Sequence, residues 1–220
     1  MTAFGDFQNS IAAADQLVAM YAELRRHRNL GRRGQLNANN VDLLWLPRSA
    51  VVACLSALDA YIHAVLNERV PIALRANPVP APLCEAMASI LTIKNGNSFK
   101  DAMPVLLSND SMAELSIKLQ EKTLAFLSFQ APEKIINAYD LIGHEDIFGK
   151  ISDIWPGPDT SAESIKRRLA GYVKRRNQIA HEGDRELNGQ PRPMQPAYAS
   201  NCREFTVSLV TRLNRVAYGL

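Results

Sequence analysis

The residues best suited to chemistry lie in one hexapeptide, Arg176-Asn177-Gln178-Ile179-Ala180-His181. Arg176 carries a permanent positive charge, Asn177 an amide, and His181 an imidazole, the side-chain type that exchanges protons near neutral pH. These three groups are suited to binding a phosphodiester and transferring its protons, which is the chemistry of metal-free RNA cleavage. We therefore take Arg176, Asn177 and His181 as the candidate catalytic residues. The simpler alternative is that the basic residues only complement the dipole of a helix end.

The hexapeptide belongs to a predicted amphipathic helix that starts at a capping box of Thr160 and Glu163 and stops at Gly183. Residues with spacings of four, three, four and three form its buried stripe: Ile165, Leu169, Tyr172, Arg176 and Ile179. A guanidinium on that stripe needs an acidic or anionic partner. His181 is rotated roughly 140° from Arg176 on a regular helix. We therefore expect the two to converge through a frayed helix end or across the two-fold axis of a homodimer.

A second predicted helix begins near Pro47 and carries a polar seam beside its apolar stripe. Ser49, Ser56, Asp59 and His63 recur at spacings of seven, three and four. Asp59 is the expected partner of Arg176, since a bidentate carboxylate–guanidinium pair would stabilise a cation on the stripe. His63 has two interpretations, a second catalytic imidazole or a structural, hydrogen-bonded histidine.

At these residues the chain resembles a known family. The run Arg175 to Asp184 resembles the Arg-x4-6-His signature of HEPN domains, in the Arg-Asn-x3-His form. The segments 48–52 and 56–61 resemble the second helix of the RiboL-PSP subgroup of that family, and Asp146-Ile147-Phe148 and Trp155 fit its spacing. The resemblance covers roughly residue 40 to the C-terminus.

The resemblance implies an all-α helical bundle, a single domain over residues 1–220. Residues 1–40 would form an N-terminal helix and a basic loop, and residues 41–220 the HEPN core. The family dimerises so that two signature helices form a composite ribonuclease site, with Arg176 and His181 as the catalytic pair, Asn177 assisting and Asp59 orienting the arginine. It also implies a toxin or phage-defence effector that acts on tRNA or another cellular RNA, with a possible antitoxin or operon partner. The tyrosine found two residues after the histidine in some relatives is replaced here by Gly183.

Two other functions remain open. The chain can be a non-catalytic helical adaptor that binds RNA or protein, or a nucleotide-binding regulator that uses the same phosphate grip. For RNA binding we single out Lys174 and Arg175 beside the signature, and Arg32 and Arg33 in the basic stretch from Arg25 to Asn40. That stretch is either a phosphate-binding flap or a solvated loop.

Composition indicates a compact soluble protein. The chain has 220 residues, of which 47% are hydrophobic and 21% charged, and its 25 basic and 22 acidic residues give a net charge of +3. Any RNA contact must therefore be local, because the chain is not a polycation. Cys54, Cys84 and Cys202 are scattered without metal-ligand spacing, so we expect buried thiols and no metal or cofactor. Neither a signal peptide nor a membrane span is expected, and we expect a cytoplasmic protein.

The remaining hydrophobic periodicity predicts a chain of helices with no repeat. A proline-rich crossover joins Pro71 to Pro82, and a loop joins Gly183 to Pro196. Besides the two helices already described, the predicted ranges are Phe7–His27, Leu83–Ile93, Phe99–Leu107, Ser111–Ser128, Glu133–Ile142, Asp146–Ile154 and Ala197–Tyr218.

Overall fold

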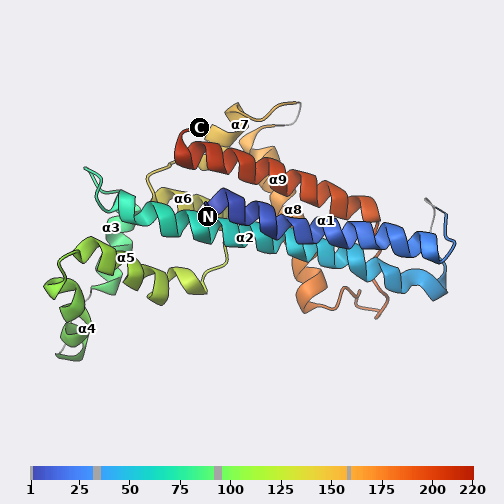
Figure 1. The fold of residues 1–220 in the computed structure, drawn as a ribbon, viewed down its shortest axis with the longest axis horizontal. Helices are drawn as coiled ribbons and strands as arrows, with labels where there is room; N and C mark the ends of the chain where they lie inside the picture. The colour runs from blue at the N-terminus through green and yellow to red at the C-terminus, as the bar shows by residue number, and fades with distance from the viewer. Residues whose placement is uncertain (1, 32–35, 92–95, 158–159) are drawn as a thin grey trace.

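The computed structural model of the chain describes residues 2–31, 36–91, 96–157 and 160–220. Throughout these ranges the fold consists of helices without strands, which confirms the predicted all-α class (Figure 1). The elements, in chain order, are α1 (Ala3–His27), η1 (Ala38–Leu44), α2 (Trp45–Ala73), α3 (Ala81–Ile90), α4 (Gly96–Leu107), α5 (Ser111–Lys122), η2 (Leu124–Phe126), α6 (Pro132–Leu141), α7 (Ile147–Asp153), α8 (Ala162–His181) and α9 (Pro196–Tyr218).

The long helix α2 lies at the centre and contacts α1, α8 and α9 (Figure 1). The backbone N–H of Ala3 donates to Glu68, and Tyr218 donates to the same carboxylate. The start of α1 and the end of α9 therefore meet near the C-terminal end of α2. Helix α1 runs antiparallel to α2, while α9 runs parallel to it. Residues 1–40 thus supply an integral helix of the bundle.

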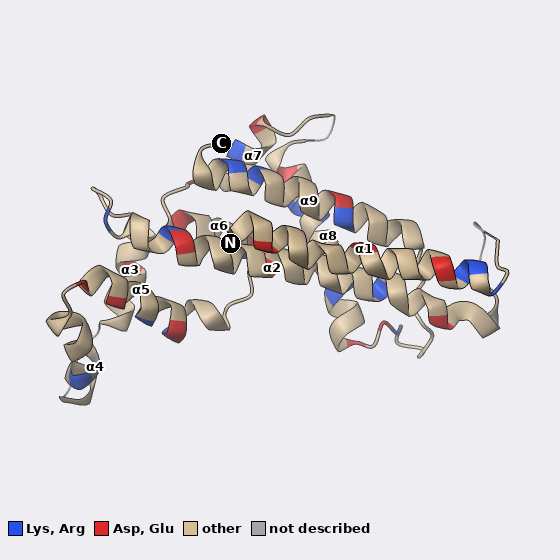
Figure 2. Ribbon diagram, in the orientation of Figure 1, with Lys and Arg blue, Asp and Glu red and all other residues tan. Residues whose placement is uncertain are grey.

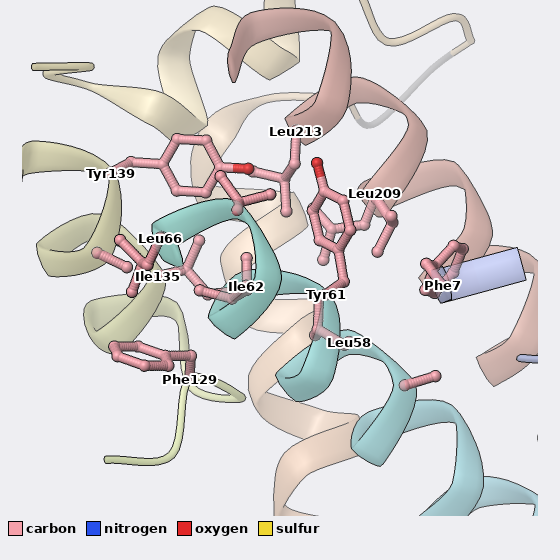
Figure 3. Close-up of a cluster of buried hydrophobic side chains, with 14 of the residues drawn as sticks. Phe7, Leu58, Tyr61, Ile62, Leu66, Phe129, Ile135, Tyr139, Leu209 and Leu213 are labelled. Carbon is pink, nitrogen blue, oxygen red and sulfur yellow. The ribbon is translucent and has the colours of Figure 1, made fainter. Parts of the chain in front are cut away.

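The core is one continuous cluster of buried side chains that joins the long helices to the shorter ones. It forms because α2 is apolar on most sides, so that neighbours can cover it all round. Figure 3 shows its middle, where α2 meets α1, α6 and α9. The labelled side chains are Phe7, Leu58, Tyr61, Ile62, Leu66, Phe129, Ile135, Tyr139, Leu209 and Leu213.

Three details of the predicted elements were wrong. Helix α8 is capped by Ser161, whose hydroxyl accepts from the N–H of Ser164, and not by Thr160. Helix α5 ends at Lys122, and a 3-10 turn follows it. Pro71 lies inside the last turn of α2 instead of opening the crossover. In each case the periodicity located the helix but not its end, because caps and final turns depend on single local hydrogen bonds.

The elements α3, α4 and α5 project from one end of the bundle (Figure 1). Several apolar side chains on α4 and in the segment after α5 are exposed there, among them Leu107, at 74%, and Phe126, at 81%. Cys54 and Cys202 are buried as expected, but Cys84 on α3 is exposed, which corrects that prediction. Its helix is short, and Cys84 lies at the edge of the buried face that Leu83 and Met87 form, about 80° around the helix from its middle.

Among the described residues, one segment, Asn39–Ala73, is long and apolar enough to cross a membrane by length and composition alone. It contains α2, and 56% of its most apolar stretch is buried against other helices. The central helix of a soluble protein meets the same criterion.

Candidate functional site

Helix α8 buries four of the five residues of its predicted stripe: Ile165, Leu169, Tyr172 and Ile179. Arg176, the fifth, is half-buried. Its Nε atom is inaccessible to solvent and has no hydrogen-bond partner among the described residues. The stem of the Arg176 side chain and its Nε atom are therefore buried at the surface of the bundle, and the outer end of the guanidinium points toward solvent.

Arg176, Asn177 and His181 form one cluster at the end of α8. Nη1 of Arg176 donates to the side-chain oxygen of Asn177 at 3.1 Å and lies 3.3 Å from Nε2 of His181. The prediction that one helix cannot bring Arg176 and His181 together was therefore wrong. The separation of roughly 140° describes the directions in which the two side chains leave the helix, and the long side chain of Arg176 spans it. A dimer is thus not needed to bring this pair together.

The contact between Arg176 and His181 involves one nitrogen of the imidazole ring, Nε2. A guanidinium only donates hydrogen bonds, so a hydrogen bond between the two side chains requires Nε2 of His181 as the acceptor. The lone pair on Nε2 is also the group that a general base uses. In this arrangement Arg176 occupies that lone pair. A ligand that draws the guanidinium away would free it.

The neighbouring Arg175 has a different environment. Its two Nη atoms donate to the two carboxylate oxygens of Asp184 at 2.5 and 2.9 Å, and Nε of Arg48 donates to the same carboxylate. Only 1% of the Asp184 side chain is exposed, against 4% for Arg48 and 13% for Arg175. Nη2 of Arg48 also donates to the carbonyl oxygen of Arg192, and Nη2 of Arg175 to that of Pro193. We call Arg48, Arg175 and Asp184 the buried ion cluster.

The backbone at Asp184 supports this burial. Gly183 and Asp184 both have positive φ, 61° and 54°, and the N–H of Asp184 donates to the carbonyl of Gln178. Aspartate is among the few residues that tolerate this conformation, so the turn can direct a carboxylate back under the helix. Sequence reasoning missed Asp184 and Arg48. The available signal was Gly183-Asp184, an acid in a turn after a helix that contains two adjacent arginines.

Asp59 does not contact Arg176, so the prediction of that pair was wrong. Its carboxylate accepts from the backbone N–H of Phe129 at 2.5 Å and from the hydroxyl of Ser128. His63, one turn further along α2, lies 3.1 Å from the carbonyl of Leu127, with its ring edge-on to Phe129. The part of the polar seam that holds Asp59 and His63 therefore faces the segment 127–129 and not the end of α8, while Ser49 and Ser56 are exposed. This geometry supports the structural interpretation of His63.

The four candidate RNA-binding residues fall into three groups. Lys174 is exposed on α8. Arg175 is engaged in the buried ion cluster, so its predicted role as an RNA contact is corrected to a structural one. Arg32 and Arg33 lie outside the described residues. Figure 2 shows basic and acidic residues interspersed along the elements visible in that view, which agrees with the small net charge.

Two tyrosines pack near the start of α9, beside the buried ion cluster. Burial raises the pKa of Tyr198 to about 12 and also raises the pKa of Tyr172. Both phenols therefore remain protonated at neutral pH and are poorly matched to general-base catalysis there. The imidazole of His181 remains the side-chain type at this helix end that is suited to proton transfer near neutral pH.

Within the described ranges, His, Cys, Asp and Glu side chains form no group of three or more that could hold a metal ion. No family model, curated protein or solved structure matches the chain. The resemblance to HEPN domains therefore rests on the residues quoted for it above.

Proposed function

We propose that the protein is a metal-independent endoribonuclease of the HEPN type. The observation that carries the proposal is the cluster at the end of α8, where the guanidinium of Arg176, which has no acidic partner among the described residues, lies 3.3 Å from the imidazole of His181. A half-buried guanidinium in that state favours an anionic ligand. The phosphodiester of RNA is such a ligand, and it carries beside it the 2′-hydroxyl that an imidazole can deprotonate.

In the proposed reaction the phosphate draws Arg176 away from His181 and frees Nε2. His181 then accepts the proton of the 2′-hydroxyl, O2′ forms a bond to phosphorus, and the bond from phosphorus to the 5′-oxygen breaks. Arg176 and Asn177 stabilise the charge that develops on the non-bridging oxygens. The products are a 2′,3′-cyclic phosphate and a 5′-hydroxyl.

The leaving 5′-oxygen needs a proton, and the described part of one chain supplies a single imidazole at this cluster. In the proposal the protonated imidazole of His181 from a second copy donates it, while the unprotonated imidazole acts as the base, as the homodimer of the resembled family implies. Two points support a dimer: the need for a second proton donor, and the resemblance to the family. The convergence of Arg176 and His181 does not require a dimer, because one helix brings them together. A role as toxin or phage-defence effector acting on tRNA rests on the resemblance alone, as does an antitoxin partner.

The test is cleavage of total tRNA and of a mixed-sequence single-stranded RNA by the purified protein in EDTA. We expect cleavage with cyclic-phosphate ends, and a loss of about 100-fold or more in His181→Ala. The control is His144→Gln, since His144 lies at the turn between α6 and α7 and has no role in the mechanism. Cleavage of both RNAs at the wild-type rate by His181→Ala would overturn the proposal, as would strict dependence on an added divalent cation.

One observation favours a second candidate, a helical adaptor that binds protein. Several large apolar side chains are exposed on the projecting helix α4 and in the turn η2, including Leu106, Leu107 and Phe126. Exposed apolar side chains that cluster often mark interaction surfaces. An adaptor would keep its cellular activity after His181→Ala, whereas a ribonuclease would lose it.

A further inference from the structure

A groove of about 430 Å³ runs along α8 beside Asn177. One side of it is a single face of α8, with Ala170, Val173 and Asn177 at spacings of three and four. The other side is the start of α6, where Pro132 is buried and presents a rigid apolar wall. The groove belongs to neither the buried ion cluster nor the polar seam of α2.

The dimensions and lining of the groove suit a flat, partly polar ring. Its volume falls within the ordinary range for small-molecule sites, roughly 300–1,000 Å³. Ala131 and Val173, which are partly exposed, offer apolar surface to the faces of such a ring, and the small Ala170 lines the groove beside Val173. Lys174, Gln178 and Glu182 line the polar part, so both donors and acceptors are available to its edge.

The groove is continuous with the proposed phosphate site through Asn177. This residue lines the groove, and its side-chain oxygen accepts from the guanidinium of Arg176. A nucleotide whose phosphate is bound by Arg176 therefore has its base beside the groove. Glu182, which follows His181 at the end of α8, also pairs with Arg192 at 2.8 Å, and this pair orients its carboxylate.

The α6 side of the groove is held in place before any ligand binds. Asp59 and His63 of α2 bind the segment 127–129, and Gln130, which follows, is buried. That segment leads directly into Ala131 and Pro132. The polar seam of α2 is thus a support for the groove wall, and a preformed wall lowers the entropic cost of binding.

We propose that this groove binds one unpaired nucleobase of the RNA, next to the phosphate that is cleaved, and so sets the nucleotide preference of the enzyme. The inference rests on the proposed function for its phosphate, and it assigns Val173, Lys174, Gln178 and Glu182 to base recognition. Unpaired bases are read in proteins by contacts to their faces and by hydrogen bonds to their edges.

The test fills the groove with Ala170→Trp. The matched control is Gly171→Trp, which adds the same side chain one position along the exposed surface of α8, where a Cβ meets no atom within 4 Å. Two measurements are made on both variants and on the wild type. The first sequences the ends produced from a mixed-sequence single-stranded RNA, and the second follows the Val173 methyl NMR signals during titration with each of the four nucleoside 3′-monophosphates and with inorganic phosphate.

We expect a nucleotide preference beside the cleaved bond in the wild type and in Gly171→Trp. In Ala170→Trp we expect cleavage at that preferred nucleotide to fall by about tenfold or more, which is the usual contribution of one bound base. The Val173 signals should move with at least one nucleotide and not with inorganic phosphate, and they should not move in Ala170→Trp.

The failures of the two proposals are distinguishable. Efficient cleavage without any preference, unchanged in Ala170→Trp, would overturn the nucleobase groove and leave the ribonuclease intact. Nucleotide-dependent shifts at Val173 in a protein that cleaves neither RNA would overturn the ribonuclease and support the groove. Shifts that inorganic phosphate alone reproduces would overturn the groove, since they would show binding of the phosphate without the base.

Discussion

Arg175 and Arg176 are neighbours on α8, yet they are held in opposite ways. Arg175 is bound through both Nη atoms to a carboxylate that is 1% exposed, and a second arginine completes the buried ion cluster. Arg176 has no acidic partner in the part of the chain that the structure describes, and its guanidinium contacts an amide and an imidazole. Arg175 thus has an acidic partner, whereas Arg176 has none among the described residues. We call these the satisfied and the unsatisfied side of the helix end.

This difference separates the residues that stabilise the fold from the residues that are available to bind a ligand. A buried ion cluster whose donors and acceptors are matched costs much to disturb, because removing one member leaves another charge buried and unpaired. An unmatched cation at a surface contributes little to folding but attracts an anion. The satisfied side therefore fixes the turn at Gly183, and the unsatisfied side, positioned by that turn, is available to a ligand. Substitutions on the two sides should accordingly have different effects.

The largest expected effect is that of Asp184→Asn. Asparagine tolerates the positive φ at this position and keeps the shape of the side chain, so the change removes the charge and turns one of the two accepting oxygens into a donor. Arg48 and Arg175 would then share no counter-ion, and we expect the free energy of unfolding to fall by about 3–5 kcal/mol. Urea denaturation monitored by circular dichroism measures it.

Glu182→Gln is the control for Asp184→Asn, because it breaks an ion pair with Arg192 at an exposed carboxylate. Its expected cost is about 0–1 kcal/mol. If the two variants unfold at the same urea concentration, the buried ion cluster does not stabilise the fold and the contrast between Arg175 and Arg176 is wrong.

A smaller effect is expected from Asp59→Ala, since Asp59 holds the backbone of the segment 127–129 instead of a buried cation. Loss of its carboxylate leaves the N–H of Phe129 without its acceptor, which should cost about 1–3 kcal/mol. Asp59→Asn keeps an acceptor and should cost less. The same urea measurement applies, and equal losses in the two variants would contradict the hydrogen bond to Phe129.

The sequence predicted the helices well because their signal is distributed over many residues. The stripe of α8 from Ile165 to Ile179 was correct at its four apolar positions, and the two ends of α9 were correct within one residue. Its prediction of partners was poorer. Periodicity places Asp59 on a polar face of α2, but which neighbour that face meets depends on how α2, α6 and α8 pack, and this is not a local property.

The candidate site shows the same limit. The types and spacing of Arg176, Asn177 and His181 were sufficient to select the cluster, since side-chain chemistry can be read directly from a sequence. The partner of Arg175 was not predicted, because Asp184 reaches it only through a turn with positive φ beyond the helix end. Helical spacing rules do not extend past that turn.

The smallest expected effect on stability is that of Arg176→Gln, and it is the sharpest test of the contrast. The substitution removes a cation that has no acidic partner and an Nε whose hydrogen bond is unmet. We therefore expect the free energy of unfolding to stay within about 0.5 kcal/mol of the wild type. Cleavage of RNA, if the proposed function holds, should fall by about 100-fold or more, because the guanidinium that stabilises the charge on the non-bridging oxygens would be missing.

Arg175→Gln is the matched comparison, one residue away, and should lose several times more stability because it removes two hydrogen bonds to a carboxylate that is 1% exposed. Urea denaturation of the two variants beside the wild type decides the point. A large loss of stability in Arg176→Gln, equal to that in Arg175→Gln, would mean that both arginines serve the fold, and the unsatisfied side of α8 would no longer stand out as a binding site.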